Sequence, residues 1–306
     1  MKVRVGRSIG LTDTGRKRRQ NEDAFVCEPP LFAIADGMGG AQAGELASRL
    51  AAAAIEEAGA AAGDAEAVAA AVRAANARIF ERSLTDPAVA GMGTTATVAL
   101  VDEHAGTLTI AHVGDSRGYR YRGGVLEQLT TDHSLVAELV RTGRLTEAEA
   151  AVHPHRSVIT RALGTEAEVE VDTRTLELAP GDLILLCSDG LSAMVRDDEI
   201  ARLLEGAGGD PYLAAETLVR AANAAGGDDN VTVVLFEVVE GSPRPQPPPP
   251  DELDAVSVGP DDVTSEAVLD DVRRHGAGKG SRWPALLFVL AILAAAAIVL
   301  WWSFLR

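Results

Sequence analysis

The chain has 306 residues, of which 47% are hydrophobic, and its formal net charge is -17. This hydrophobic content is sufficient for a large folded core. The negative charge excludes a general attraction to nucleic acid, because the chain would repel a phosphate backbone. The two cysteines give no disulfide framework, and Cys187 lies in an apolar run that is typical of a buried strand.

Residues 1–240 are interpreted as one globular domain. Its short apolar runs predict strands at residues 31–35, 94–101, 107–113, 118–124, 182–187 and 230–239. Its other periodic stretches predict helices at residues 44–58, 64–82, 134–142, 197–205 and 211–225. Because several strands follow one another after short turns, antiparallel pairing is expected. Clusters of strands between helices, without strict alternation, favour an α+β sandwich over a doubly wound fold.

The composition changes after this domain. Residues 241–282 begin with PRPQPPPP and continue with acidic and glycine-rich sequence, which predicts a cytoplasmic linker. Docking of its proline run to a proline-binding module is the alternative to a plain spacer. Residues 283–305 contain a long apolar run with tryptophans at both ends, which predicts a single transmembrane helix rather than a buried one.

The charges around this apolar run predict its orientation. Four basic residues precede the run and only Arg306 follows it, so the positive-inside rule places the large domain in the cytoplasm. The N-terminal sequence MKVRVGRSIG has no apolar stretch after its charges, so no secretion signal is expected. The predicted location is therefore the cell membrane, with a C-terminal anchor and a cytoplasmic domain. The oligomeric state is not predicted.

Carboxylates occur at the ends of several predicted strands. Asp36 ends one strand in IADGMGG, Asp115 follows another in HVGDSR, Asp189 follows a third in LLCSDG, and Asp229 precedes a fourth in GGDDN. Each motif alone is typical of a turn, but four of them in one domain indicate a shared site at a sheet edge. Such carboxylates would repel one another without cations. The residue that recurs in these motifs is aspartate, whereas their His112 and Cys187 lie within the predicted strands. A hard cation such as Mg²⁺ or Mn²⁺ is therefore favoured over zinc.

These stretches, taken in order, resemble the motifs of the metal-dependent protein phosphatases, the type 2C serine/threonine phosphatase family. The resemblance covers about residues 8–239, and the wording DGMGG with the predicted C-terminal span resembles the bacterial membrane-anchored branch. The implied fold is a four-layer α-β-β-α sandwich of two antiparallel sheets flanked by helices. The motifs are TDTGRKRRQNEDAF (12–25), ADGMGG (35–40), GMGTTATVAL (91–100), HVGDSRGYRYRGG (112–124), TDHSLV (131–136), LLCSDGLS (185–192) and GGDDNVTVV (226–234).

The resemblance implies a site with two Mn²⁺ or Mg²⁺ ions. Asp36 would bridge them, the backbone carbonyl of Gly37 would bind one, and Asp189 and Asp229 would complete the protein ligands of the other. A bridging hydroxide would then attack phosphorus directly, without a phosphoenzyme. The glycines of DGMGG would permit unusual dihedral angles and a close approach of the backbone.

Further roles are implied at neighbouring positions. Arg18 matches the family's phosphate-binding arginine, whose fork suits two phosphate oxygens. The other basic residues of RKRR (16–19) are interpreted as an exposed basic patch. Glu22 and Asp23 would hold metal-bound waters. Asp115 would help to bind a third, weaker ion, or would instead be a structural carboxylate bonded to Arg117. The threonines of GMGTT would support packing beneath the site.

One position departs from the pattern of many eukaryotic members. Those read DGHGG, and their histidine is proposed to protonate the leaving group, whereas this chain has Met38, which has no proton to donate. The general acid is then a metal-bound water or another histidine. Residues 132–163 resemble the family's mobile flap and contain three histidines, of which His153 is the candidate.

The leading hypothesis is a membrane-tethered phosphatase of phosphoserine and phosphothreonine proteins. Its partners would be phosphorylated proteins, including transmembrane serine/threonine kinases that it opposes. The alternative is a catalytically inactive module that binds phosphoproteins at the membrane. This alternative predicts lost metal ligands, yet every ligand position is filled.

Overall fold

The computed structural model describes residues 2–59 and 64–242. Contacts along the chain group residues 1–245 into one compact unit. The predicted linker beyond residue 242 and the predicted transmembrane helix lie outside the described residues. Within the described ranges, no helix has both the length and the apolar character needed to cross a membrane.

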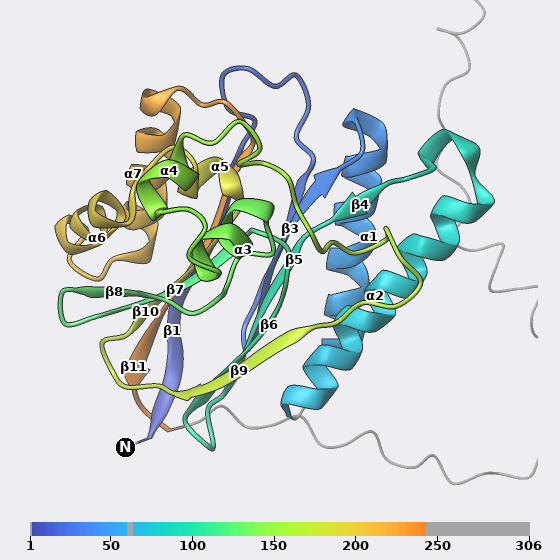
Figure 1. The fold of residues 1–306 in the computed structure, drawn as a ribbon. Helices are drawn as coiled ribbons and strands as arrows, with labels where there is room; N and C mark the ends of the chain where they lie inside the picture. Colours follow the sequence, from blue (N-terminus) through green and yellow to red (C-terminus); the bar gives the residue numbers. More distant parts are fainter. Residues whose placement is uncertain (1, 60–63, 243–306) are drawn as a thin grey trace, which may run out of the picture. The chain divides into compact units, whose positions relative to one another are not determined.

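Two antiparallel sheets form the centre of the unit (Figure 1). The first sheet has the strand order β1 (Val3–Asp13), β11 (Val231–Glu240), β10 (Leu183–Cys187), β7 (Arg117–Arg122) and β8 (Val125–Gln128). The second has the order β2 (Asp23–Glu28), β3 (Leu31–Met38), β5 (Ala96–Asp102), β6 (Thr107–Val113) and β9 (Asp172–Glu177), and the short β4 (Gly93–Thr94) pairs with β3. Every pairing is antiparallel, as predicted.

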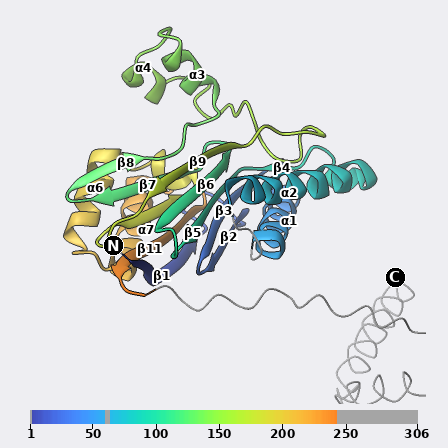
Figure 2. The same ribbon diagram turned by 90° about the horizontal axis from the view of Figure 1, so that it is seen from below.

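Helices cover the outer face of each sheet. On one side, α1 (Ala41–Gly59) and α2 (Ala65–Thr85) pack on the second sheet, and η1 (Pro87–Val89) follows them. On the other, α6 (Asp197–Gly206) and α7 (Pro211–Ala225) pack on the first, beside the single turn α5 (Asp189–Ser192). Two more helices, α3 (Leu135–Arg141) and α4 (Glu147–Ala151), stand apart from these layers in the predicted flap (Figure 2).

A third apolar cluster joins the two sheets face to face. Phe32 of β3 stacks on Phe236 of β11 with ring centroids 4.0 Å apart, and both side chains are fully buried. Alternate residues of β3 face this inter-sheet core and the helix-covered core, which is why its run from Leu31 to Ala35 is apolar throughout. The predicted α+β sandwich of two antiparallel sheets flanked by helices is confirmed.

All the predicted strands and helices within the described residues occur, with ends that differ by a few positions. Cys187 is fully buried, as expected. Strands β1, β2, β8 and β9 and the short helices η1, α4 and α5 were not predicted. In β9, five of the six residues are exposed, so the strand lacks the apolar alternation that would reveal it. Strand β1 carries charged residues and is only half buried beyond Val5.

Candidate metal centre and phosphate site

Carboxylates from separate strand ends meet at one edge of the sheet pair. Asp36 lies near the end of β3 and is directly opposite Asp23 of β2. Asp189 begins α5 directly after β10, and Asp229 lies just before β11. Asp115 lies in the turn between β6 and β7. The charges of all four neighbours act on the Asp36 carboxyl, so the sequence-predicted metal ligands are brought together with Asp23 around Asp36.

This crowding changes the acidity of the cluster. Burial, followed by repulsion from the neighbouring carboxylates, raises the pKa of Asp36 well above its usual value. Burial also raises the pKa of Asp23 and of Asp115 to about 7. The pKa of Asp189 rises to about 6, through burial and the charge of Asp229. Near neutral pH, the cluster therefore resists carrying all of its negative charges at once.

The donor set fits hard divalent cations. The cluster offers carboxylate oxygens and no thiolate or imidazole, as Mg²⁺ and Mn²⁺ prefer. One of its oxygens, Oδ1 of Asp23, is buried without a hydrogen-bond partner among the described residues. Within residues 2–59 and 64–242, however, no group of three or more acidic, histidine or cysteine side chains has the geometry needed to hold a metal ion. Two carboxylates of the cluster are turned to protein donors instead, Asp229 to Arg18 at 2.7 Å and Asp23 to Thr232 at 2.6 Å.

The backbone of Asp36 is fixed from below by two threonines. The Asp36 N–H donates to Thr95 Oγ1 at 3.0 Å, and the Asp36 carbonyl accepts from the Thr95 N–H at 2.9 Å. The Thr94 hydroxyl also donates to this carbonyl, at 2.8 Å. Thr94 and Thr95 are fully buried, so they support Asp36 and do not face a substrate.

The glycines of DGMGG serve two separate purposes. A Cβ on Gly37 would lie 2.1 Å from the carbonyl oxygen of Gly44 in α1 and 2.6 Å from that of Glu22, so Gly37 permits a close approach of three backbone segments. The left-handed φ angles occur later, at Gly39 (112°) and Gly40 (96°). The predicted unusual dihedrals therefore belong to the turn into α1 and not to Gly37.

The loop before β2 holds Arg18 at the edge of the carboxylate cluster. Arg18 Nη2 lies 2.7 Å from Asp229 Oδ2, and its Nη1 lies 3.9 Å from Glu22 Oε1. The Arg18 side chain is about half exposed (49%), so its guanidinium is accessible to a bound phosphate group. Glu22 is buried (7% exposed) beside Gly44, where burial raises its pKa.

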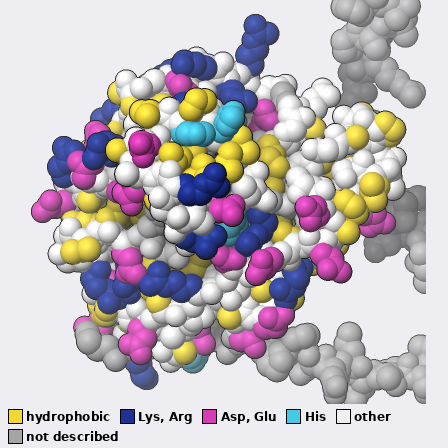
Figure 3. Space-filling view, viewed as in Figure 1, with side chains coloured by type: hydrophobic (Ala, Val, Ile, Leu, Met, Phe, Trp, Pro, Cys, Tyr) yellow, Lys and Arg dark blue, Asp and Glu magenta, His cyan; other side chains and the backbone are white. Residues whose placement is uncertain are grey.

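The other basic residues of RKRR are exposed, as predicted, but some of them are bound to the chain itself. Lys17 forms an ion pair with Asp228 at 2.7 Å, and the backbone N–H groups of Arg16 and Lys17 donate to the Gly227 carbonyl. This run is therefore bound to the loop before β11. Acidic and basic side chains are also interspersed over the face shown in Figure 3.

Asn230 was not predicted as a site residue, yet it positions the Arg18 loop. Its Nδ2 donates to the carbonyls of Thr14 (3.0 Å) and Gln20 (2.9 Å), and its Oδ1 accepts from the Glu22 N–H at 2.8 Å. Asn230 is 3% exposed. The signal in the sequence was a polar residue at the buried start of an apolar strand, immediately after the paired aspartates of GGDDN.

Comparison with known proteins decides the family. A family model described as "Protein phosphatase 2C" matches residues 9–231. The chain belongs to the protein phosphatase 2C family. It is 45% identical over 244 residues to the serine/threonine protein phosphatase PstP of Mycobacterium tuberculosis, which covers 77% of this chain but only 46% of that relative. It is 40% identical over 240 residues to the serine/threonine phosphatase stp of Listeria monocytogenes, covering 74% of this chain and 93% of that protein.

Comparison with solved structures agrees with this family assignment. The crystal structure of the serine/threonine phosphatase PstP/Ppp of Mycobacterium tuberculosis matches with a TM-score of 0.72 and 42% identity, and covers 78% of this chain and 100% of that one. A PstP catalytic domain described as a complex with two manganese ions matches with a TM-score of 0.71 and 40% identity, over 78% of this chain and 100% of that one. The fold of this protein phosphatase 2C domain is therefore that of its bacterial relatives.

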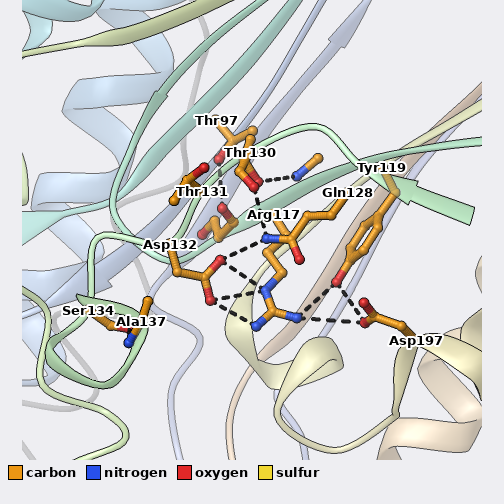
Figure 4. A network of polar contacts seen from close by, with 12 residues as sticks. Thr97, Arg117, Tyr119, Gln128, Thr130, Thr131, Asp132, Ser134, Ala137 and Asp197 are labelled. Carbon is orange, nitrogen blue, oxygen red and sulfur yellow. Dashed lines mark hydrogen bonds and ion pairs between the residues drawn. The ribbon is translucent and has the colours of Figure 1, made fainter. Parts of the chain in front are cut away.

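Among the described residues, Asp115 forms no ion pair with Arg117, which was the alternative to its predicted metal role. Arg117 binds Asp132 instead (Figure 4). Asp115 is buried (9% exposed) as part of the acidic cluster. The charge of Arg117 still lowers the pKa of Asp115, but less than burial and the neighbouring carboxylates raise it. The alternative of a carboxylate bonded to Arg117 is thus not supported by the observed contacts.

The flap histidines differ in their surroundings. His153 Nδ1 accepts the N–H of His155 at 3.1 Å, and no contact of His153 with the acidic cluster occurs within the described part of the chain. His133 is buried at the start of the flap, where its Nδ1 accepts a hydrogen bond from the Gly114 N–H at 3.0 Å. Met38 stands opposite Gly93, with its Cε near that glycine. These contacts do not test whether His153 is the general acid, so that role stays a prediction.

Proposed function

We propose that this protein phosphatase 2C domain hydrolyses phosphoserine and phosphothreonine in proteins at a site with two Mn²⁺ or Mg²⁺ ions. The observation that carries the proposal is the gathering of acidic side chains around Asp36 with the Arg18 guanidinium beside them. The names of the bacterial relatives and the two manganese ions of one solved relative support it. Because the chain spans about half the length of the curated Mycobacterium tuberculosis relative, its activity is part of the proposal.

In this proposal each group has a separate task. Asp36, Asp189, Asp229 and the Gly37 carbonyl hold the two cations, and Asp115 contributes to a third, weaker site. The bound cations would neutralise the crowded carboxylates and make a water molecule sufficiently acidic to attack phosphorus. Arg18 binds two phosphate oxygens through its guanidinium fork. Glu22 and Asp23 act beside the ligands and orient water.

The proton for the leaving group has no assigned donor. Met38 cannot supply it. His153 lies in the flap and is half-buried, so it is the side-chain candidate for this step. A solvent proton is the competing source, and a His153→Gln variant separates the two. An unchanged rate for a substrate with a poor leaving group would remove His153 from the mechanism.

We also propose that the domain acts at the cell membrane through the predicted helix at 283–305, with residues 241–282 as its cytoplasmic linker. Tethering would raise its effective concentration against membrane-bound phosphoproteins, of which transmembrane serine/threonine kinases are the proposed class. Recovery of the full chain in the membrane fraction, and of a chain ending at residue 242 in the soluble fraction, tests the anchor. Equal distribution of both chains would contradict it.

The activity test uses the full chain in a mild detergent. It should hydrolyse p-nitrophenyl phosphate and a phosphothreonine peptide with added Mn²⁺, and lose both activities in EDTA. Titration calorimetry with Mn²⁺ should show binding. The alternative, an inactive phosphoprotein-binding module, predicts peptide binding without turnover, and that result would overturn the proposed function.

A further inference from the structure

Both ends of the flap are hydrogen-bonded to segments that lie beside the proposed metal ligands. At its start, the His133 N–H donates to the Gly114 carbonyl at 2.7 Å, directly beside Asp115. At its end, Leu163 and Thr94 exchange two backbone hydrogen bonds, of 2.8 and 3.1 Å, and Thr94 is paired with Gly37. We call these two ends of the flap, at Asp132–His133 and at Leu163, its first and second stems. The position of the flap relative to the carboxylates depends on them.

Arg117 holds the first stem from the first sheet. It is the first residue of β7, and its guanidinium donates to both carboxylate oxygens of Asp132, from Nε at 3.0 and 3.1 Å and from Nη2 at 2.8 Å (Figure 4). Asp132 also accepts from Gln128 Nε2 at 3.0 Å. The Asp132 side chain is 15% exposed, so solvent competes little for this bidentate pair.

The opposite side of the same guanidinium is also bound. Arg117 Nη1 donates to the Tyr119 hydroxyl at 3.0 Å and lies 3.6 Å from Asp197 of α6. The Tyr119 hydroxyl in turn donates to Asp197 at 3.0 Å. Figure 4 shows the guanidinium between Asp132 on one side and Tyr119 and Asp197 on the other. The arginine is thus held by contacts with Tyr119 of the first sheet and Asp197 of α6, and its bond to Asp132 links the flap stem to them.

We propose that Arg117 is a positioning residue that sets the flap over the carboxylate edge through Asp132, and that its loss weakens the use of phosphopeptides more than that of small phosphate esters. The inference rests on the proposed function. A peptide extends beyond the phosphate group and reaches the flap, whereas a small ester is held at the edge by the cations and Arg18. A displaced flap therefore removes binding energy from the peptide selectively.

The test compares Arg117→Met and Asp132→Asn with the matched control Arg174→Met in the full chain. Arg174 forms an arginine–carboxylate pair of 2.7 Å with Glu127, between β9 and β8, and within the described residues it has no hydrogen bond or ion pair to the flap. The kcat/KM values are measured for a phosphothreonine peptide and for p-nitrophenyl phosphate with saturating Mn²⁺. In both flap-stem variants the ratio of peptide to ester kcat/KM should fall about tenfold, mainly through the peptide KM.

A second measurement reports on the flap without turnover. Trypsin should cut at the flap sites Arg141, Arg144 and Arg156 about fivefold faster in Arg117→Met than in the unchanged chain, because opening of the flap becomes easier. Arg117→Lys should recover part of both effects, since lysine keeps the charge but not the fork. Cleavage positions are read by mass spectrometry.

The outcomes of these two measurements decide whether Arg117 positions the flap. An unchanged ratio, or a fall equal to that in Arg174→Met, would overturn the proposal, as would flap cleavage at the original rate. If Arg117→Met does not fold, Asp132→Asn decides by the same criteria, and failure of both to fold would make the pair purely structural. If the unchanged chain hydrolyses neither substrate, the proposed function fails, while flap cleavage still decides the positioning role.

Discussion

Arg18 donates a hydrogen bond of 2.7 Å from Nη2 to Oδ2 of Asp229. The contact links the candidate phosphate-binding arginine, in the loop before β2, to a candidate metal ligand before β11. A cation at Asp229 and a phosphate group at Arg18 would both compete with this ion pair. If both assignments hold, phosphate binding and metal binding at this edge would therefore be coupled through one carboxylate.

The first prediction separates these two roles. Arg18→Ala should raise the KM for p-nitrophenyl phosphate about tenfold or more, because a charge-assisted fork to phosphate is lost. The affinity for Mn²⁺ in calorimetry should stay the same or rise, since Asp229 is released from its ion pair. Arg19→Ala, at an exposed neighbouring position, is the control and should change neither value. A weaker Mn²⁺ affinity in Arg18→Ala would contradict this account.

The second prediction concerns the central carboxylate. Asp36→Asn should lower kcat with Mn²⁺ at least about a thousandfold, because the bridging charge is lost and metal catalysis supplies several kcal/mol. The same change at Asp228, an acid paired with Lys17, should leave kcat nearly unchanged. Steady-state hydrolysis of p-nitrophenyl phosphate checks both variants. Full turnover by Asp36→Asn would remove Asp36 from the site.

The third prediction is a pH dependence of the metal-free protein. The folded-state pKa values of Asp23 and Asp115, about 7, and of Asp189, about 6, lie above the usual value of about 3.9 for an unfolded chain. Between these values the folded state binds more protons than the unfolded state. The contribution of these groups to stability therefore increases as the pH falls from about 7.5 to about 5.

Thermal unfolding in EDTA checks this sign. The melting temperature should rise by a few degrees, roughly, as the pH is lowered over that range. With Mn²⁺ the trend should weaken or reverse, because cations bind the deprotonated carboxylates more tightly at higher pH. Asp36→Asn should stabilise the metal-free protein at pH about 7.5, since it removes a repelling charge. Identical pH profiles with EDTA and with Mn²⁺ would contradict the assignment.

The sequence predicted the buried part of the fold well because burial leaves a local signal. Strand β10 is apolar throughout and β11 is apolar for most of its length, so their existence follows from composition over a few residues. Strand β9 gave no such signal, because its stability comes from pairing with β6 and its side chains are exposed. Long-range pairing of this kind cannot be read from a local pattern.

The candidate site was predictable in its ligands but not in their supports. The recurrent pattern of an acid at the end of an apolar strand identified Asp36, Asp115, Asp189 and Asp229, and the family resemblance assigned their roles. Arg117 binds Asp132 and not Asp115, although Asp115 is nearer in the sequence. This choice of partner depends on how the start of the flap packs, and the sequence does not reveal that packing. Asn230 was missed for the same reason, since its partners lie more than 200 positions earlier in the chain.

The fourth prediction tests the close approach at Gly37. In Gly37→Ala the new Cβ would lie 2.1 Å from a backbone oxygen of α1, so β3 and α1 must separate. Calorimetry should show at least about tenfold weaker Mn²⁺ binding, because Asp36 and the Gly37 carbonyl shift together. Gly206→Ala is the control, since its added Cβ meets nothing within 4 Å. Unchanged Mn²⁺ affinity in Gly37→Ala would show that this contact does not set the metal site.

The fifth prediction concerns Asn230, which fixes the Arg18 loop from below. Asn230→Ala leaves two backbone carbonyls and the N–H of the buried Glu22 without their partner, so the free energy of unfolding should fall by about 2–4 kcal/mol. Asn76→Ala is the matched control, because Asn76 is also buried and binds two backbone carbonyls and one N–H, but beside the end of the flap. Chemical denaturation should give similar losses of stability in the two variants.

Kinetic measurements then distinguish a role of Asn230 in positioning Arg18 from a role in stability alone. Asn230→Ala should raise the KM for p-nitrophenyl phosphate toward the value of Arg18→Ala, whereas Asn76→Ala should leave this KM within about twofold. If Asn230 acts through Arg18, the KM of the double variant should be close to that of Arg18→Ala alone, since the two changes remove the same interaction. Fully additive effects would show that Asn230 supports the site by another route, through Glu22 or the strand β11 itself.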